Sequence, residues 1–324
     1  MHKKSLNLST GIPVATAAAL AIYLGLTTAF GINEVVSTLR KLPWAWWLLA
    51  PAICLANHLL LEGRWQFYLN QLGYPLRFKA ASSIYAAGLA LIAAPGRSGE
   101  AVRGLWLQRR HGFPLTVGVG ITLAERLADL ASALLVLSWG LGEHVWAAML
   151  IGLAVLGTGG WLLTHRRVLQ KLENWLVSLP LHQRWNGLIR LLREAVLAMG
   201  RMRQLMKPWP LLVGTVMACI CWIAESWLLM AVYGALGTPM NLHQTAVIRT
   251  ATGLGGVISL LPAGLGTSEA TSIGLAMLYG ADRSQALAIT LLLRLCTLAL
   301  PCLIGMVALV LQSDLSRSAK AAED

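Results

Sequence analysis

Charged residues are scarce in this sequence. Asp, Glu, Lys and Arg make up 12% of its 324 residues, about half of the roughly 25% that is usual in soluble domains, whereas 56% are hydrophobic. So few polar side chains cannot cover a soluble globule of this length, which excludes a water-soluble enzyme as well as a disordered chain or a coiled coil. Together with the mean hydropathy of +0.64, the long apolar runs predict an all-α polytopic membrane protein.

Acidic residues are scarcer still, since 14 Asp and Glu stand against 26 Lys and Arg and leave a net charge of +12. The basic residues cluster in a few stretches between the apolar runs. This pattern is typical of cytoplasmic loops that face an anionic leaflet, and it predicts membrane lipid rather than nucleic acid as the partner.

Motifs for a redox centre, a metal site or a nucleotide site are missing. The chain has no CxxC, no Cys and His group with zinc-ligand spacing, and no GxxxxGK[ST]. We therefore expect no cofactor, no metal and no direct use of ATP. The five cysteines all lie in apolar segments, where we expect small core residues rather than disulfides: Cys54, Cys219, Cys221, Cys296 and Cys302.

Six apolar runs are long enough to cross a bilayer, which needs about 20 residues. They cover residues 11–33, 43–63, 115–139, 145–164, 209–233 and 284–311. The first run follows Lys3 and Lys4 as a signal peptide would, but its length and the lack of a convincing cleavage site favour a span. Trp44 and Trp209 stand at the ends of two other runs, as interfacial anchors do.

Two further apolar regions are interrupted. Residues 80–111 break at Pro95-Gly96, and residues 244–280 break at Pro262-Ala263-Gly264. Proline removes a backbone donor and glycine permits a turn, and such a break is tolerated at membrane depth only inside protein or beside a wet cavity. Each half is also too short to span. We therefore predict two re-entrant helix hairpins.

The distribution of basic residues predicts the topology. Nine basic residues and only Glu173 and Glu194 lie in 165–208, whereas the predicted external loops hold only Arg40, Lys41 and Arg283. With both termini in the cytoplasm, the second span returns to the inside at Arg64, Arg77 and Lys79. The two hairpins then enter from opposite sides of the membrane.

This topology predicts an inverted repeat of the transporter type within a single integral membrane domain, 1–324. Glu100 precedes Arg126 by 26 positions, and Glu269 precedes Arg294 by 25. The segments are a first span (1–42), a first half (43–164, with hairpin 80–111), a basic cytoplasmic linker (165–208), a second half (209–311, with hairpin 244–280) and a cytoplasmic tail (312–324). The linker is either an amphipathic helix on the leaflet or a solvated connector.

Ionisable residues gather around the two breaks and on the spans that follow. After each break a half-helix begins, with Ser98 and with Thr267 or Ser268 as expected N-caps, and its N–H groups favour an anion. Arg97 beside such a terminus suits a phosphate. The candidate substrate-binding or translocation residues are Arg97, Ser98, Glu100, Arg103, Glu125, Arg126, Asp129, Glu225, Arg249, Thr267, Ser268, Glu269 and Arg294; the hairpin-break residues are Pro95, Gly96, Gly99, Pro262, Gly264 and Gly266.

Structural roles compete with these assignments. Glu100 and Glu269 stand where first-turn acids cap a helix, and Glu125, Arg126 and Asp129 can form an internal ion-pair network. His58 and His243 suit packing or interfacial positions and receive no role, and Pro301 predicts a kink in the last span.

The same residues carry a family resemblance. Three stretches resemble the flippase-like family named for the transmembrane region of lysylphosphatidylglycerol synthases: Pro95-Gly96-Arg97-x-Gly99-Glu100-x-x-Arg103, Glu125-Arg126-x-x-Asp129, and Leu261-Pro262-Ala263-Gly264-Leu265-Gly266-Thr267-Ser268-Glu269. Gly280, Arg294 and Pro301-x-x-x-Gly305 are similar too, so that the resemblance covers nearly the whole chain. It implies a lipid translocase with the matched Arg and Glu positions along its path. The bifunctional synthases continue into a long aminoacyl-transferase domain, whereas this sequence ends at Asp324, so aminoacyl transfer is not expected.

The leading hypothesis is a non-enzymatic flippase of the bacterial inner (plasma) membrane that moves a phosphate-head-group lipid between leaflets. Its cargo is a phospholipid, an aminoacyl-phospholipid or a polyprenyl-linked lipid, and its transport direction, energy coupling and oligomeric state stay open. Two alternatives remain. One is an intramembrane transferase that uses a lipid- or polyprenyl-linked donor, and the other is a membrane scaffold that docks lipid-biosynthesis enzymes on 165–208.

Overall fold

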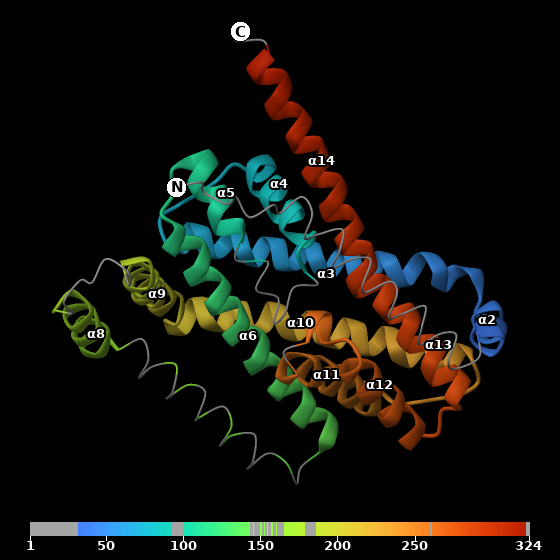
Figure 1. Cartoon of the computed structure of the whole chain (residues 1–324). Helices are drawn as coiled ribbons and strands as arrows, with labels where there is room; N and C mark the ends of the chain where they lie inside the picture. The colour runs from blue at the N-terminus through green and yellow to red at the C-terminus, as the bar shows by residue number, and fades with distance from the viewer. Residues whose placement is uncertain are drawn as a thin grey trace. The chain divides into compact units, whose positions relative to one another are not determined.

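The computed structural model describes residues 32–92, 100, 102–142, 165–178, 186–259 and 261–321, together with 145, 150, 152, 154, 157 and 160. Within these residues the regular structure is entirely helical (Figure 1), which confirms the predicted all-α class. The predicted first span, 11–33, and most of 145–164 fall outside the described residues. So do Arg97, Ser98 and the break residues Pro95, Gly96 and Gly99.

Three helical stretches of the described chain are long and apolar enough to cross a membrane. They are α3 (Trp44–Gln71), α10 (Pro208–Ala235), and Arg283–Leu311, a stretch that includes α13 (Arg283–Arg294) and the π turn η5 (Leu295–Ala299) and continues into α14 (Leu300–Ala321). Each coincides with a predicted span. Helix α6 (Leu115–Leu141), predicted as 115–139, is also about 40 Å long but carries three charged residues. These helices are consistent with a multi-pass membrane protein.

The helix that contains the second predicted span is longer than that span. Helix α3 continues past residue 63 to Gln71. Arg64, which was predicted at the cytoplasmic end of the span, lies within this helix, and its side chain is buried in the protein with 1% of its surface exposed. Gly63 alone does not end the helix, because Trp65, Tyr68 and Leu69 continue the buried apolar face. The chain turns only at Gly73, whose φ of 82° is accessible to glycine.

The chain divides into two compact units that alternate along the sequence. The first comprises Met1–Leu55, Ala86–Glu100 and Ser226–Asp324, and the second comprises Ala56–Tyr85 and Ala101–Glu225. Helices α3, α10 and α4 (Phe78–Leu89) each contribute residues to both units.

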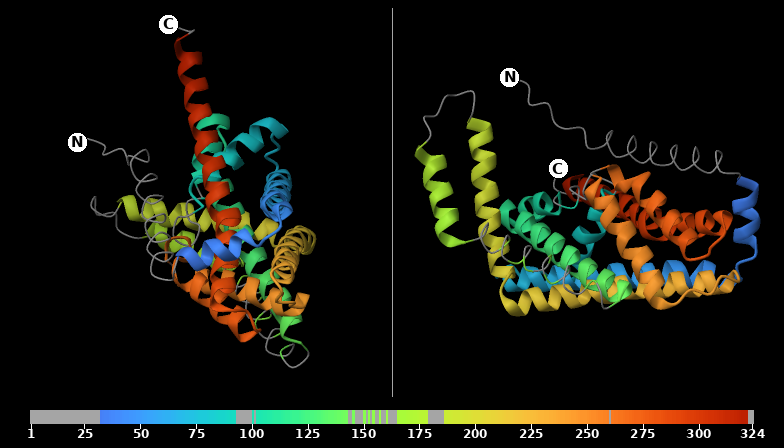
Figure 2. Two further views of the ribbon diagram at one scale, coloured as in Figure 1. Left: turned by 90° about the vertical axis from the view of Figure 1, so that its right-hand side faces the viewer. Right: turned by 90° about the horizontal axis from the view of Figure 1, so that it is seen from below.

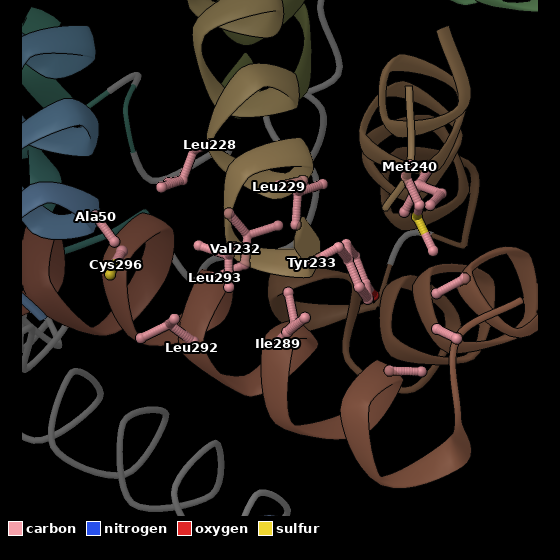
Figure 3. Close-up of a cluster of buried hydrophobic side chains, with 14 of the residues drawn as sticks. Ala50, Leu228, Leu229, Val232, Tyr233, Met240, Ile289, Leu292, Leu293 and Cys296 are labelled. Carbon is pink, nitrogen blue, oxygen red and sulfur yellow. The ribbon is translucent and has the colours of Figure 1, made fainter. Parts of the chain in front are cut away.

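The core of the first unit is apolar. Figure 3 shows Val232 and Tyr233 of α10 directed towards Leu293 and Ile289 of α13. Helix α2 (Ile32–Arg40) packs on the same helix α13 through Val35. The buried members of the main cluster are Leu42, Ala50, Cys54, Leu228, Leu229, Val232, Tyr233, Met240, Ile248, Ala276, Ala281, Ala286, Ile289, Leu292, Leu293 and Cys296. This packing holds the helices that carry the second break.

The predicted interruption of 244–280 is observed. Helix α11 (Leu242–Ile258) ends before the short η4 (Pro262–Gly264), and α12 (Thr267–Leu278) packs back against α11. The two helices approach closely, since a Cβ on Gly256 would collide with Ser268 Oγ. With 17 and 12 residues they are about 26 and 18 Å long, shorter than a bilayer core of about 30 Å.

The helices on either side of the first break are also short. Helix α4 has 12 residues and α5 (Val102–His111) has 10, or about 18 and 15 Å. The turn that follows α4 meets α14 within the first unit: the Cys302 thiol lies 3.5 Å from the Ala90 carbonyl, and a Cβ on Gly305 would collide with the Ala90 backbone. This close approach requires glycine at position 305.

The irregularity expected at Pro301 takes the form of a π turn. Residues 295–299 are π-helical, and Pro301, which has no N–H to donate to the preceding turn, follows them after one intervening residue. Arg294 therefore stands at the junction between a regular helix and a widened turn.

The basic stretch 165–208 contains two helices rather than one. Helices α8 (Arg166–Ser178) and α9 (Asn186–Leu205) lie side by side (Figure 2), and α9 also packs on α6. A Cβ on Gly120 of α6 would stand 2.8 Å from the Ala198 carbonyl oxygen and 2.7 Å from Arg201 Cβ, so the backbones of α6 and α9 are in close contact. Helix α9 is thus part of the second unit.

Candidate functional site

The second break is built from backbone conformations that favour glycine. Gly264 and Gly266 have φ angles of 65° and 85°, and Ala263 between Pro262 and Gly264 has a φ of 53°. A left-handed conformation costs a non-glycine residue about 1–2 kcal/mol. The surrounding contacts therefore hold this turn in place.

Helix α12 is capped differently from the prediction. Gly266 is the N-cap residue, and Thr267 and Ser268 are the first two helical residues, so their assignment as N-caps is wrong. The Gly266 N–H donates to Glu269 Oε2 at 2.7 Å, while the Thr267 hydroxyl donates to the Gly264 carbonyl at 3.1 Å. The reason is the sharp turn at Gly266, which starts the helix before either hydroxyl is reached. Glu269 thus caps the helix, which is the structural role considered above as the alternative to substrate binding.

Arg294 closes over the same break. Its Nε donates to Glu269 Oε1 at 2.8 Å, and its terminal nitrogen lies 3.5 Å from the Gly264 carbonyl. The Glu269 side chain is 5% exposed and that of Arg294 is 16% exposed. A hydroxyl pair, Ser272 and Thr290 at 2.8 Å, joins α12 to α13 beside them. Glu269 and Arg294, which lie 25 positions apart in the sequence, thus form an ion pair that is largely buried.

A second charged group lies in the second unit, on helices α3, α5 and α6. Asp129 of α6 binds Arg64 of α3 at 2.7 Å and Arg126 at 3.1 Å. Glu125 binds Arg103 of α5 at 3.2 Å, and both of these side chains are at most 4% exposed. We call these five residues the α6 network. It is the ion-pair network proposed above as the structural alternative, enlarged by Arg64 and Arg103.

Aromatic rings complete the surroundings of Arg103. Its guanidinium lies 4.9 Å from the centre of the Tyr85 ring and 5.8 Å from that of Trp65. Cation–π contacts of this kind help to compensate a buried cation for lost hydration. The Arg103 charge is thus held by a carboxylate and two aromatic faces.

A glycine contact places Arg103 opposite Glu125. Helices α5 and α6 pack together, and a Cβ on Gly118 would collide with the Gly104 backbone next to Arg103. We expect Gly118→Ala to separate the helices and to destabilise the protein by about 1–3 kcal/mol. The apparent melting temperature can be measured with a dye that fluoresces on reaction with thiols. Four of the five cysteines are buried and become accessible to the dye only when the protein unfolds.

Gly200→Ala is the matched control for Gly118→Ala. It lies within α9 and its Cβ would meet no atom within 4 Å. Since alanine favours a helix by about 1 kcal/mol over glycine, this change should leave the melting temperature unchanged or raise it. Equal melting temperatures for the two variants would contradict the close contact between α5 and α6.

The sequence profile described as the lysylphosphatidylglycerol synthase TM region matches residues 12–305. The chain belongs to this family. The resemblance drawn from the two breaks and the α6 motif is thereby confirmed, and with it membership of a family of membrane proteins.

Two archaeal relatives of this family member cover most of its length. A UPF0104 membrane protein of Methanocaldococcus jannaschii is 21% identical over an alignment of 312 residues that covers 89% of this chain and 91% of the relative. A UPF0104 membrane protein of Methanothermobacter thermautotrophicus is 26% identical over an alignment of 282 residues that covers 82% of each chain. Their names describe membrane proteins.

Sequence reasoning missed two buried polar residues of this family member besides Arg64. The Glu62 carboxylate accepts hydrogen bonds from Gln66 Nε2 at 3.0 Å and from the Ser82 hydroxyl. Asn57 donates to the candidate Glu225 at 3.1 Å and to the Cys221 carbonyl at 3.2 Å. All of these residues except Ser82 lie on α3 or α10. Polar side chains within these two apolar helices are the sequence feature that could have indicated buried hydrogen bonds.

The two other described candidates, Glu100 and Arg249, are at least partly buried. Glu100 is buried, with 5% of its surface exposed, and Arg249 is half-buried on α11. Arg126, predicted as the counterpart of Arg294, forms its ion pair with Asp129 on its own helix. No group of three His, Cys, Asp or Glu side chains that could hold a metal occurs in the described part of the chain.

Four of the five cysteines are buried: Cys54, Cys221, Cys296 and Cys302. Two of them, Cys54 and Cys296, belong to the core of the first unit. The prediction that these four are core residues is confirmed, whereas Cys219 is half-buried.

Proposed function

We propose that this membrane protein moves a lipid with a phosphate-bearing head group between leaflets, without enzymatic chemistry. The observation that carries the proposal is the pair formed by Glu269 and Arg294 across the second break. An ionisable side chain within a membrane-spanning segment costs about 3 kcal/mol or more. A buried charged pair beside a strained turn is therefore typical of a substrate path.

The chemistry of the pair suits a reversible phosphate site. Arg294 presents a planar fork that binds carboxylate and phosphate in the same geometry. In the present structure Glu269 accepts a hydrogen bond from the Nε of this guanidinium. A lipid phosphate would replace the carboxylate on Arg294, and the released Glu269 would balance the local charge or bind an amine of the head group.

The proposed path also includes the first break and the α6 network. By its sequence, Arg97 would bind phosphate at the first break, while Arg126 is the most exposed cation of the network, at 29%. In the proposed arrangement, six spans and two re-entrant hairpins of opposite orientation form an inverted repeat in the inner (plasma) membrane, with both termini in the cytoplasm. The short helices on both sides of each break support the hairpins.

Lipid translocation in proteoliposomes tests the proposal. Phosphatidylglycerol with a fluorescent acyl chain is placed in both leaflets, and a membrane-impermeant reductant bleaches the outer one. We expect the wild type to expose the inner pool and Arg294→Gln to slow this step about tenfold or more, because a charge-assisted hydrogen bond contributes about 1.5–3 kcal/mol and 1.4 kcal/mol is a factor of ten.

Arg283→Gln is the matched control, since Arg283 begins the same helix α13 and is exposed. It should translocate lipid at the wild-type rate. Equal rates for both variants, or no translocation of phosphatidylglycerol, phosphatidylethanolamine or a polyprenyl phosphate by folded wild-type protein, would refute the proposed function.

A further inference from the structure

Helix α8 presents two apolar surfaces, and one of them packs on α9. Leu169 is buried against Val196 and Met199 of α9. On the other surface Val168, Leu172 and Trp175 are 37%, 38% and 56% exposed. Since aliphatic and indole side chains favour removal from water, the exposed area of this second surface favours contact with an apolar phase.

The exposed residues form one stripe. Their spacing of four and then three positions places them within about 60° of one another on a helix with 100° per residue. On the same scale, exposed Lys171 and Arg167 flank one edge of the stripe at about 70° and 110° from its centre, whereas exposed Gln170 lies nearly opposite. The helix therefore combines an apolar stripe, a basic flank and a polar back.

We propose that this stripe docks on the surface of an anionic lipid leaflet. A helix with a basic flank and a Leu/Trp face lies in the interface, with its apolar side chains below the headgroups and its cations among them. Tryptophan at the end of the stripe fits the same depth, because indole favours the headgroup region. We call this surface the α8 lipid face: Arg167, Val168, Lys171, Leu172 and Trp175.

Charge complementarity favours lipid over a protein partner. The stretch 165–208 holds nine basic residues and two acids. This excess of positive charge is attracted to an anionic membrane surface. Helix α9 is fixed by its close contact with α6, and α8 packs on α9, so the lipid face has a firm support (Figure 2). The proposal goes beyond lipid translocation and holds whether or not the protein moves lipid.

A fluorophore at the lipid face tests this docking in the full-length protein. An environment-sensitive bimane is attached to Leu172→Cys and, as a control, to Gln170→Cys, both with Cys219 replaced by alanine. The proteins are placed in nanodiscs of phosphatidylcholine or of phosphatidylcholine with phosphatidylglycerol in a ratio of about 7:3. Lipids that carry a nitroxide high on the acyl chain quench a fluorophore at the interface.

We expect the Leu172 label to shift to the blue and to be quenched on the order of twofold more in the anionic discs, because basic flanks strengthen interfacial binding. The Gln170 label should be unaffected. Arg167→Glu with Lys171→Glu, or a high salt concentration, should remove the dependence on anionic lipid.

Two results would overturn the proposal. Equal quenching of the Leu172 and Gln170 labels would show that α8 has no lipid-facing side. A blue-shifted Leu172 label that the nitroxide lipids do not quench would show that a second copy or another protein covers the stripe. Neither result bears on translocation, which is measured separately with the Arg294→Gln and Arg283→Gln variants.

Discussion

Asp129→Asn is expected to lower the stability of the protein by about 3–5 kcal/mol, the usual cost of breaking a buried ion pair by removing one partner. Asp129 Oδ1 binds Arg64 at 2.7 Å, and the Arg64 side chain is only 1% exposed. The amide leaves this guanidinium buried without a compensating negative charge at that position. The apparent melting temperature should fall on the order of 10 °C, as measured by the thiol-reactive dye.

Arg126→Gln is the control for this prediction, because it removes the other partner of the same carboxylate. Arg126 is 29% exposed, so its pair with Asp129 is partly solvated. Partly solvated pairs contribute about 1 kcal/mol or less, and the melting temperature should change little. Comparable losses for Asp129→Asn and Arg126→Gln would mean that burial does not distinguish the two pairs.

Replacing the buried cation should rescue the first variant. Arg64→Met in the Asp129→Asn background removes the uncompensated charge and keeps an apolar stem of similar length. In a double-mutant cycle the two changes should couple favourably, so that the double variant is more stable than Asp129→Asn alone. Additive losses would indicate that Arg64 and Asp129 act independently.

The helical class and the position of the second break could be predicted from the sequence because both depend on local chemistry. A run of about 20 apolar residues has few alternatives to a helix, and Pro262-Ala263-Gly264 interrupts one wherever it stands. The exact start of α12 could not be predicted. Thr267 and Ser268 are the better N-cap residues by preference, but the φ of 85° at Gly266 starts the helix one residue earlier.

The partners of the charges depended on tertiary packing. The positions of Glu125 and Asp129 on one side of a helix followed from their spacing, but the partner of Asp129 on α3 did not. Arg64 resembled a loop cation at the end of a span, and only its burial in α3 against Asp129 assigns it to the α6 network. Similarly, the contact of Gly118 with Gly104 that places Arg103 opposite Glu125 has no local signature.

The two roles of Glu269 can be separated by Glu269→Gln and Glu269→Leu. Glutamine retains a side-chain oxygen for the Gly266 N–H and so preserves the cap, because Glu and Gln both serve at this position of a capping box. It removes the negative charge that holds Arg294. Leucine removes both the cap and the charge.

We expect Glu269→Gln to melt close to the wild type, within about 1 kcal/mol of its stability, and to translocate lipid about tenfold more slowly or worse. Its slow step differs from that of Arg294→Gln: phosphate still binds Arg294, but without the carboxylate nothing displaces the phosphate on release. Glu269→Leu should lose stability as well as translocation. Wild-type translocation by Glu269→Gln, together with a loss of stability in Glu269→Leu, would reduce Glu269 to a helix cap and leave Arg294 as the substrate-binding member of the pair.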